Sequence, residues 1–221
     1  MNLYAIVGQS DTGKTRLMLQ LIAELKARGR SVGAIKHCPS GFSLEVEGKD
    51  SWHFAQAGAD WVAVTSPDQV AVLRNTPDQV DARSLAQRHF PDVDVVLVEG
   101  ARQDKGLRKI EVLRKGIAEE LQTPPDELTA VVADVEVATD KPVYRPDEIR
   151  ELADFLDQGA EDTVSGVLLS VDGTPVPLNP FVRAVFGNVV SGMVASLKGV
   201  AQAPKHITLT VARKEAAHEG R

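Results

Sequence analysis

The stretch Gly8-Gln9-Ser10-Asp11-Thr12-Gly13-Lys14-Thr15 follows the pattern G-x-x-x-x-G-K-T, typical of loops that bind the phosphates of nucleoside triphosphates. Gly8 and Gly13 let backbone N–H groups approach a phosphate, because a side chain there would stand in its way. Lys14 is expected to contact the β- and γ-phosphates, and the Thr15 hydroxyl to ligate the Mg²⁺ that bridges them. The stretch therefore predicts a triphosphate site formed by all eight residues.

The residues on either side of this loop predict the secondary structure that such a site needs. Residues 3–7 form a short uncharged apolar run, typical of a buried parallel strand. After the loop, apolar residues recur at helical spacing and end before Gly29, which predicts a helix. That helix would direct the positive end of its dipole at the phosphates. The alternative is an ordinary glycine-rich turn between a strand and a helix, which would bind no phosphate.

Length, composition and charge limit the classes of function. The chain has 221 residues, of which 43% are hydrophobic and 25% charged, as in soluble globular proteins. Its net charge of −6 argues against a dominant nucleic-acid surface. Cys38 is the single cysteine, which fits a reducing compartment. No signal peptide precedes the loop, and the uncharged residues 184–197 are too few to cross a bilayer. We expect a cytoplasmic protein that binds neither nucleic acid nor membrane.

The order of the remaining segments indicates the fold class. Apolar runs predict further strands, and helical patterns lie between several of them. The expected strands cover residues 31–35, 61–66, 69–73, 93–98, 110–113 and 128–133, and the expected helices cover 52–57, 81–89 and a segment opened by Pro146. Such alternation predicts an α/β protein with a mostly parallel sheet flanked by helices.

A change of composition divides the chain. Residues 157–162 are acidic and carry no large apolar side chain, so we place a domain boundary there. Residues 1–158 would form the nucleotide-binding domain and residues 163–213 a small α+β module, followed by a frayed polar tail, 214–221. In the module we expect a hairpin at Asp172-Gly173, a helix capped by Asn179-Pro180 and a last strand through residues 207–211.

Two acidic residues lie at opposite ends of the buried strand predicted at residues 93–98. Glu99 follows its carboxyl end, where a carboxylate in phosphate-loop proteins holds Mg²⁺ or orients the attacking water. Asp94 lies near the other end, about 16 Å away at ~3.3 Å per residue. We therefore predict a catalytic and metal-binding role for Glu99 and a structural role for Asp94.

Other charged loop residues are candidates with open alternatives. Lys36 and His37 follow a predicted strand at the same sheet edge, although His37 is alternatively a hydrogen-bonded loop histidine. Asp50 is either a second Mg²⁺ ligand or a helix cap, and Lys49 either a phosphate contact or a surface lysine. A basic cluster after Glu99 is either a solvated loop or a clamp on an anion, and it comprises Arg102, Lys105, Arg108 and Lys109.

Taken in order, these motifs resemble the MobB family of molybdopterin-guanine dinucleotide biosynthesis adaptor proteins. The resemblance covers about residues 1–158, and blocks at fitting intervals accompany the phosphate loop. They are Lys36-His37, Gly48-Lys49-Asp50-Ser51-Trp52, Ala57-Gly58-Ala59, Val98-Glu99-Gly100 and Lys109-Ile110-Glu111-Val112. Two departures are Cys38-Pro39-Ser40, where relatives usually carry further histidines, and Ala101, where they usually carry an aromatic residue.

The resemblance implies a P-loop NTPase fold, GTP binding with weak hydrolysis, and a homodimer. It also implies partnership with the guanylyltransferase that attaches GMP to molybdopterin, and with molybdopterin or its dinucleotide. Preference for guanine rests on this resemblance alone, because the chain has no N-K-x-D motif. Two rival functions are a small-molecule kinase with Arg102 and Arg108 as lid residues, and a nucleotide-dependent switch without a cofactor role.

Overall fold

The structure is a computed structural model that describes residues 1–43, 47–76, 80–90, 92–158, 167, 169–171, 174–176, 178–201, 204 and 207–211. The chain divides into two compact units, Met1–Thr163 and Val164–Arg221. The first unit contains the phosphate loop and a six-stranded sheet.

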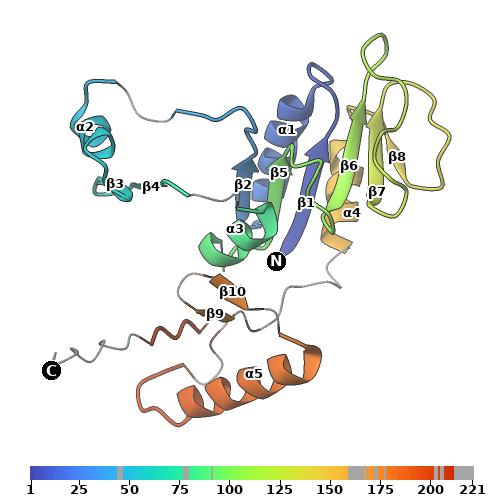
Figure 1. The fold of residues 1–221 in the computed structure, drawn as a ribbon. Coiled ribbons are helices and arrows are strands. Elements are labelled where there is room, and N and C mark those ends of the chain that lie inside the picture. Colours follow the sequence, from blue (N-terminus) through green and yellow to red (C-terminus); the bar gives the residue numbers. More distant parts are fainter. Residues whose placement is uncertain are drawn as a thin grey trace, which may run out of the picture. The chain divides into compact units, whose positions relative to one another are not determined.

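Every strand pair in this sheet is parallel, and the strand order is β2-β5-β1-β6-β7-β8 (Figure 1). The strands are β1 Asn2–Val7, β2 Val32–Lys36, β5 Val95–Glu99, β6 Arg108–Leu113, β7 Leu128–Ala133 and β8 Val143–Tyr144. The predicted α/β class with a mostly parallel sheet is confirmed. All six residues of β1 are buried, as the uncharged run at its position predicts.

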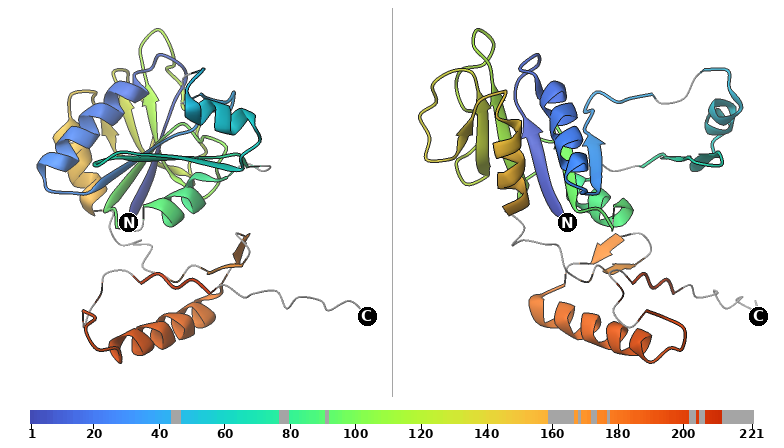
Figure 2. Two further views of the ribbon diagram at one scale, coloured as in Figure 1. Left: turned by 90° about the vertical axis from the view of Figure 1, so that its left-hand side faces the viewer. Right: turned by 180° about the vertical axis from the view of Figure 1, so that it is seen from behind.

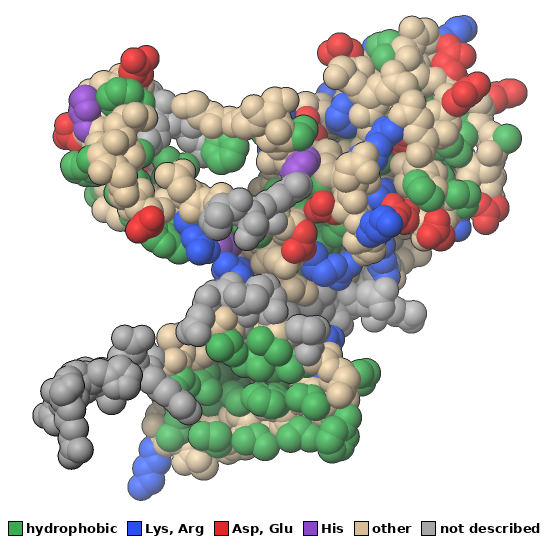
Figure 3. Space-filling view, in the orientation of Figure 1, with side chains coloured by type: hydrophobic (Ala, Val, Ile, Leu, Met, Phe, Trp, Pro, Cys, Tyr) green, Lys and Arg blue, Asp and Glu red, His purple; other side chains and the backbone are tan. Residues whose placement is uncertain are grey.

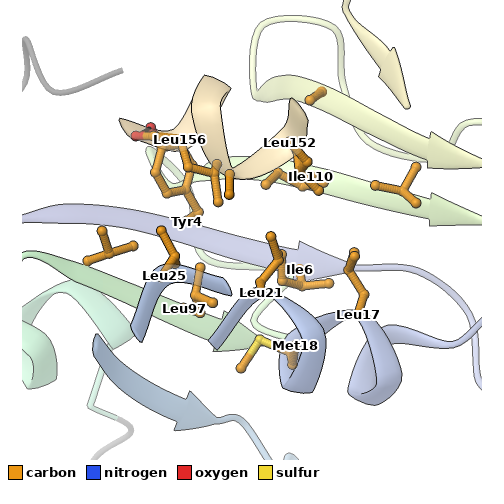
Figure 4. Packing of buried hydrophobic residues seen from close by; sticks show 14 of the residues in the cluster. Tyr4, Ile6, Leu17, Met18, Leu21, Leu25, Leu97, Ile110, Leu152 and Leu156 are labelled. Atoms are coloured by element: carbon orange, nitrogen blue, oxygen red, sulfur yellow. Dashed lines mark hydrogen bonds between the residues drawn. The ribbon is translucent and has the colours of Figure 1, made fainter. Parts of the chain in front are cut away.

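Helices cover both faces of the sheet (Figure 2, left). Helices α1 (Lys14–Ala27) and α4 (Ile149–Gln158) share a buried cluster with one face. In this cluster the Tyr4 hydroxyl donates a hydrogen bond of 3.3 Å to the carbonyl oxygen of Leu156 (Figure 4). Helix α3 (Ala82–His89) packs on the other face through Ala82 and Ala86. Helix α4 begins three residues after Pro146, because residues 145–148 form a turn in which the Glu148 carboxylate accepts from the N–H of Arg145.

The strand register determines which residues meet at the carboxyl edge of the sheet. Ile6 of β1 and Lys36 of β2 are both aligned with Glu99 at the end of β5. On the other side of β1, Val7 is aligned with Glu111 of β6. The phosphate loop follows Val7 directly, so it begins at this edge.

Helix α2 (Asp50–Gln56) and the antiparallel strands β3 (Trp61–Thr65) and β4 (Val70–Arg74) form a separate element. The two strands expected at residues 61–66 and 69–73 are confirmed. Of the two alternatives for Asp50, the helix cap is wrong, because α2 begins at Asp50 itself. The N-cap position belongs to Lys49, whose side chain makes no cap hydrogen bond.

In the second unit, strands β9 (Leu169–Val171) and β10 (Thr174–Val176) pair antiparallel. Helix α5 (Pro180–Ala195) follows, and the Asn179 side chain caps it by accepting from the N–H of Val182 at 2.9 Å. Both features were expected. The turn residues Asp172 and Gly173 and the tail 214–221 lie outside the described residues. The strand expected at residues 207–211 is wrong, since these residues adopt no regular structure.

Helix α5 presents a large apolar surface, which Figure 3 shows in green. None of its residues is buried, and 77% of Phe181 is exposed. Among the helices that the structure describes, none is long and apolar enough to span a membrane.

Candidate functional site

The phosphate loop is closely packed against the strand beside it. A Cβ atom on Gly8 would lie 2.6 Å from the carbonyl oxygen of Val112 and 2.9 Å from Oγ1 of Thr12. The buried Thr12 hydroxyl donates a hydrogen bond of 3.0 Å to the carbonyl oxygen of Gln9, which closes the loop on itself. Gly13 has a φ of 99°, in the left-handed region that favours glycine. Both glycines of the motif are therefore required by the backbone geometry.

The environment of Lys14 favours an anion. Its ammonium donates to the carbonyl oxygen of Gln9 at 2.5 Å. Desolvation by burial lowers the pKa of Lys14, and the nearby charges of Arg102 and Lys36 lower it further, against the opposite effect of Glu99 and Asp11. Burial and neighbouring cations destabilise the charged form of an ammonium. A bound phosphate would stabilise it again by supplying the opposite charge.

The loop and the end of β5 meet through Thr15 and Glu99, which lie 84 residues apart in the sequence. The Thr15 hydroxyl is 3.0 Å from both carboxylate oxygens of Glu99. Lys36 reaches the same carboxylate at 3.2 Å. A hydroxyl and a carboxylate at this distance are oxygen ligands of the kind that Mg²⁺ takes beside a nucleotide phosphate. The described residues hold no group of three or more His, Cys, Asp or Glu suited to a metal, so phosphates and water would complete such a site.

The segment after Glu99 is fixed by tight backbone packing. Gly100 and Ala101 both have positive φ, at 90° and 57°. A Cβ atom on Gly100 would lie 3.4 Å from the carbonyl oxygen of His37, whose N–H donates to the carbonyl oxygen of Glu99 at 3.0 Å. Ala101 is 2% exposed within the core, so the alanine is fully packed. The backbone of His37 thus belongs to the site edge.

Arg102 is held at this edge by a buried carboxylate. Glu111 is 1% exposed and accepts hydrogen bonds from the backbone N–H groups of Gln122 and Thr123, the latter at 2.9 Å. It also lies 3.3 Å from Nη2 of Arg102. These contacts compensate a charge that would otherwise be expensive to bury, and they hold Arg102 near Lys14.

The basic cluster does not form one clamp. Lys109 is 1% exposed and donates at 2.7 Å to the carbonyl oxygen of Arg102, and it forms an ion pair with Glu127. The guanidinium of Arg108 lies over the ring of Tyr4. The two residues are aligned in the sheet, three residues before the aligned pair Val7 and Glu111 at the carboxyl edge. The clamp interpretation is therefore wrong for Arg108 and Lys109, as is the proposed lid role of Arg108.

Other acidic candidates lie elsewhere. Asp94 accepts from the N–H and hydroxyl of Ser31 at 2.8 and 2.7 Å, a structural contact that ties the start of β5 to the segment before β2. Lys49 and Asp50 stand at the start of α2. In the described parts of the chain, no hydrogen bond or ion pair joins Lys49 or Asp50 to the phosphate loop, and their role stays a prediction.

Sequence reasoning missed one residue next to the loop. A Cβ atom on Gly13 would lie 3.6 Å from Nη1 of Arg114, which follows the end of β6. The signal was present in the sequence, because residues that follow parallel strands gather at one edge of the sheet.

Comparison with known proteins identifies the family. The family model for molybdopterin guanine dinucleotide synthesis protein B, MobB, matches residues 3–134, more than half of the chain. The chain belongs to the MobB family.

MobB relatives with established names are similar over most of their length. The molybdopterin-guanine dinucleotide biosynthesis adapter protein of Escherichia coli is 34% identical over 163 residues, which cover 70% of this chain and 90% of the relative. Its Haemophilus influenzae counterpart is 33% identical over 156 residues, covering 70% and 87%. A crystal structure of molybdopterin-guanine biosynthesis protein B matches with a TM-score of 0.56 and 27% identity, and covers 72% of this chain and 99% of that one.

Gly8→Ala tests whether the loop geometry carries triphosphate binding in this MobB protein. The added Cβ would meet the carbonyl oxygen of Val112, so the loop must shift away from β6. We expect titration calorimetry to show at least tenfold weaker binding of a triphosphate, about 1.4 kcal/mol.

The matched control is Gly192→Ala on α5, where a Cβ would meet no atom within 4 Å. It should leave the affinity unchanged. Unaltered affinity in Gly8→Ala would contradict the loop assignment.

Proposed function

We propose that this chain is a GTP-binding adaptor in molybdenum cofactor maturation, which assists the guanylyltransferase that attaches GMP to molybdopterin and hydrolyses GTP slowly. Membership of the MobB family supports the adaptor role. The observation that carries nucleotide binding is the contact of the Thr15 hydroxyl with both carboxylate oxygens of Glu99, beside a loop whose glycines have no room for side chains.

Each site residue has a part in this proposal. The backbone N–H groups of residues 8–15 cradle the phosphates, and Lys14 with Arg102 compensates the negative charge on the β- and γ-phosphates. Thr15 and Glu99 would hold Mg²⁺, which supplies charge neutralisation between those phosphates. Glu99 also orients the attacking water. Its carboxylate also accepts from Thr15 and Lys36, which hold it in place beside the loop.

The proposal includes a cytoplasmic homodimer. A two-stranded hairpin is marginally stable by itself in water, and β3–β4 exposes large apolar side chains. These are Trp61, Val64, Val70 and Val72, each more than half exposed. A second copy that covered this hairpin would remove the apolar area from water, at about 25 cal/mol per Å². The single cysteine supports a cytoplasmic location, because it fits a reducing compartment.

The rival kinase function predicts different behaviour toward small molecules. A kinase consumes triphosphate rapidly only when its acceptor is present, whereas an adaptor hydrolyses slowly whatever small molecule is added. We expect the full chain to retain a molybdopterin guanylyltransferase in a pulldown and to show a hydrolysis rate that small-molecule acceptors do not raise. Rapid acceptor-dependent turnover without retention of the guanylyltransferase would favour the kinase.

Lys14→Ala should abolish triphosphate binding and leave the fold intact, because Lys14 is not in the core and its ammonium donates to a carbonyl oxygen of the loop itself, that of Gln9. Losing a charge-assisted contact costs about 2–3 kcal/mol, a factor of thirty or more.

Calorimetry should also show that the unaltered chain binds GTP more tightly than ATP. Equal affinities for the two would count against the adaptor proposal.

Glu99→Gln should retain much of the GTP affinity and slow Mg²⁺-dependent hydrolysis by tenfold or more, on the order of 1.4 kcal/mol, because the charge and not the shape performs the task. Asp94→Asn is the matched control from the other end of β5 and should change thermal stability at most. Asp50→Asn decides the open case. It should resemble Glu99→Gln if Asp50 is a second Mg²⁺ ligand, and Asp94→Asn if it is not. Hydrolysis slowed tenfold or more in Asp94→Asn would refute this site.

A further inference from the structure

The turn after β6 holds Arg114 in a fixed backbone geometry. The N–H of Arg114 donates to the carbonyl oxygen of Ala118, and the N–H of Ala118 donates back, both at 2.9 Å. Carboxylates fix the residues between them, since Asp134 accepts from the N–H of Lys115 and Glu119 from the N–H of Gly116, each at 2.7 Å. Hydrogen bonds thus hold the backbone of Arg114 and of the two residues that follow it.

The guanidinium of Arg114 differs from the cations of the basic cluster at residues 102–109. Arg102, Arg108 and Lys109 are engaged with Glu111, Tyr4 and Glu127. The Arg114 side chain is exposed, and within the described segments no carboxylate or carbonyl group accepts a hydrogen bond from it. Its Nη1 atom stands next to Gly13.

Positive charge and backbone N–H donors gather around this position. Gly13 is the N-cap of α1, so the N–H groups and the positive end of the helix dipole face the same space as the guanidinium. Lys14 adds a further positive charge. A phosphate at the loop would accept hydrogen bonds from the guanidinium, from Lys14 and from the backbone N–H groups together.

We propose that Arg114 binds the α- and β-phosphates of the nucleotide from the β6 side of the phosphate loop. Strands β5 and β6 flank β1 on opposite sides, so Arg114 stands across the loop from Glu99 and Lys36. The backbone around Gly13 belongs to the part of such loops that cradles the α- and β-phosphates, whereas the lysine reaches the β- and γ-phosphates.

This inference rests on the proposed function, and it makes a distinct prediction. A contact with the α- and β-phosphates exists in the diphosphate as well as in the triphosphate. Loss of Arg114 should therefore weaken GDP and GTP binding to a similar extent. A merely solvated surface arginine would contribute nothing measurable to either.

The test is calorimetric titration of the full chain with GTP and with GDP, in the presence of Mg²⁺. Arg114→Gln should weaken both by at least tenfold, with the two losses equal within about threefold. Arg114→Lys should recover part of the affinity, since an ammonium keeps the charge but loses the bidentate geometry. The matched control Lys115→Gln removes the same charge from the next residue of the turn and should change either affinity less than about threefold.

The outcomes separate this inference from the proposed function. Unaltered affinity in Arg114→Gln, a loss confined to GTP, or an equal loss in Lys115→Gln would overturn the role of Arg114 while GTP binding by the unaltered chain stands. An unaltered chain that binds neither nucleotide would overturn both. Thermal unfolding of Arg114→Gln should match the unaltered chain, because the side chain is exposed.

Discussion

The parallel pairing of β1 with β5 on one side and β6 on the other is the constraint on which the site depends. Parallel strands end at a common edge, so the segments that leave them must meet there. This pairing brings Glu99 and Lys36 to the phosphate loop from one side and Glu111 and Arg114 from the other. The complete burial of β1 fixes the register, because a slip of one residue would exchange the side chains on its two faces.

A buried polar network supports the loop between β5 and β6. Lys109 and Glu111 point from β6 into protein, and each is satisfied by backbone groups as well as by an opposite charge. Removing one partner of such a pair typically costs about 3–5 kcal/mol, since the other charge stays buried and uncompensated. Contacts with buried residues therefore hold Arg102 in place at the site.

The second unit differs from the first in that its helix leaves most of its apolar side chains exposed. Helix α5 carries a single charged residue, Arg183, and leaves apolar side chains exposed along its length. A solvated helix normally presents a polar face, so the sequence of α5 is that of a helix that needs contacts on more than one side. The chain thus combines a domain with a complete core and a small unit whose apolar surface exceeds what its own hairpin covers.

The sequence by itself determined the phosphate loop, the parallel α/β fold and the place of Glu99 and Lys36. Those features follow from local patterns together with one rule of sheet geometry, that parallel strands share a carboxyl edge. Only the tertiary structure decided which charged residues reach that edge. Arg102, Arg108 and Lys109 look alike in sequence, yet Lys109 is buried because Glu127, 18 residues away, compensates it. The sequence places Arg114 at the end of a predicted strand, but it stands beside Gly13 because that strand, β6, pairs with β1, and pairing between distant segments is decided only in the tertiary structure.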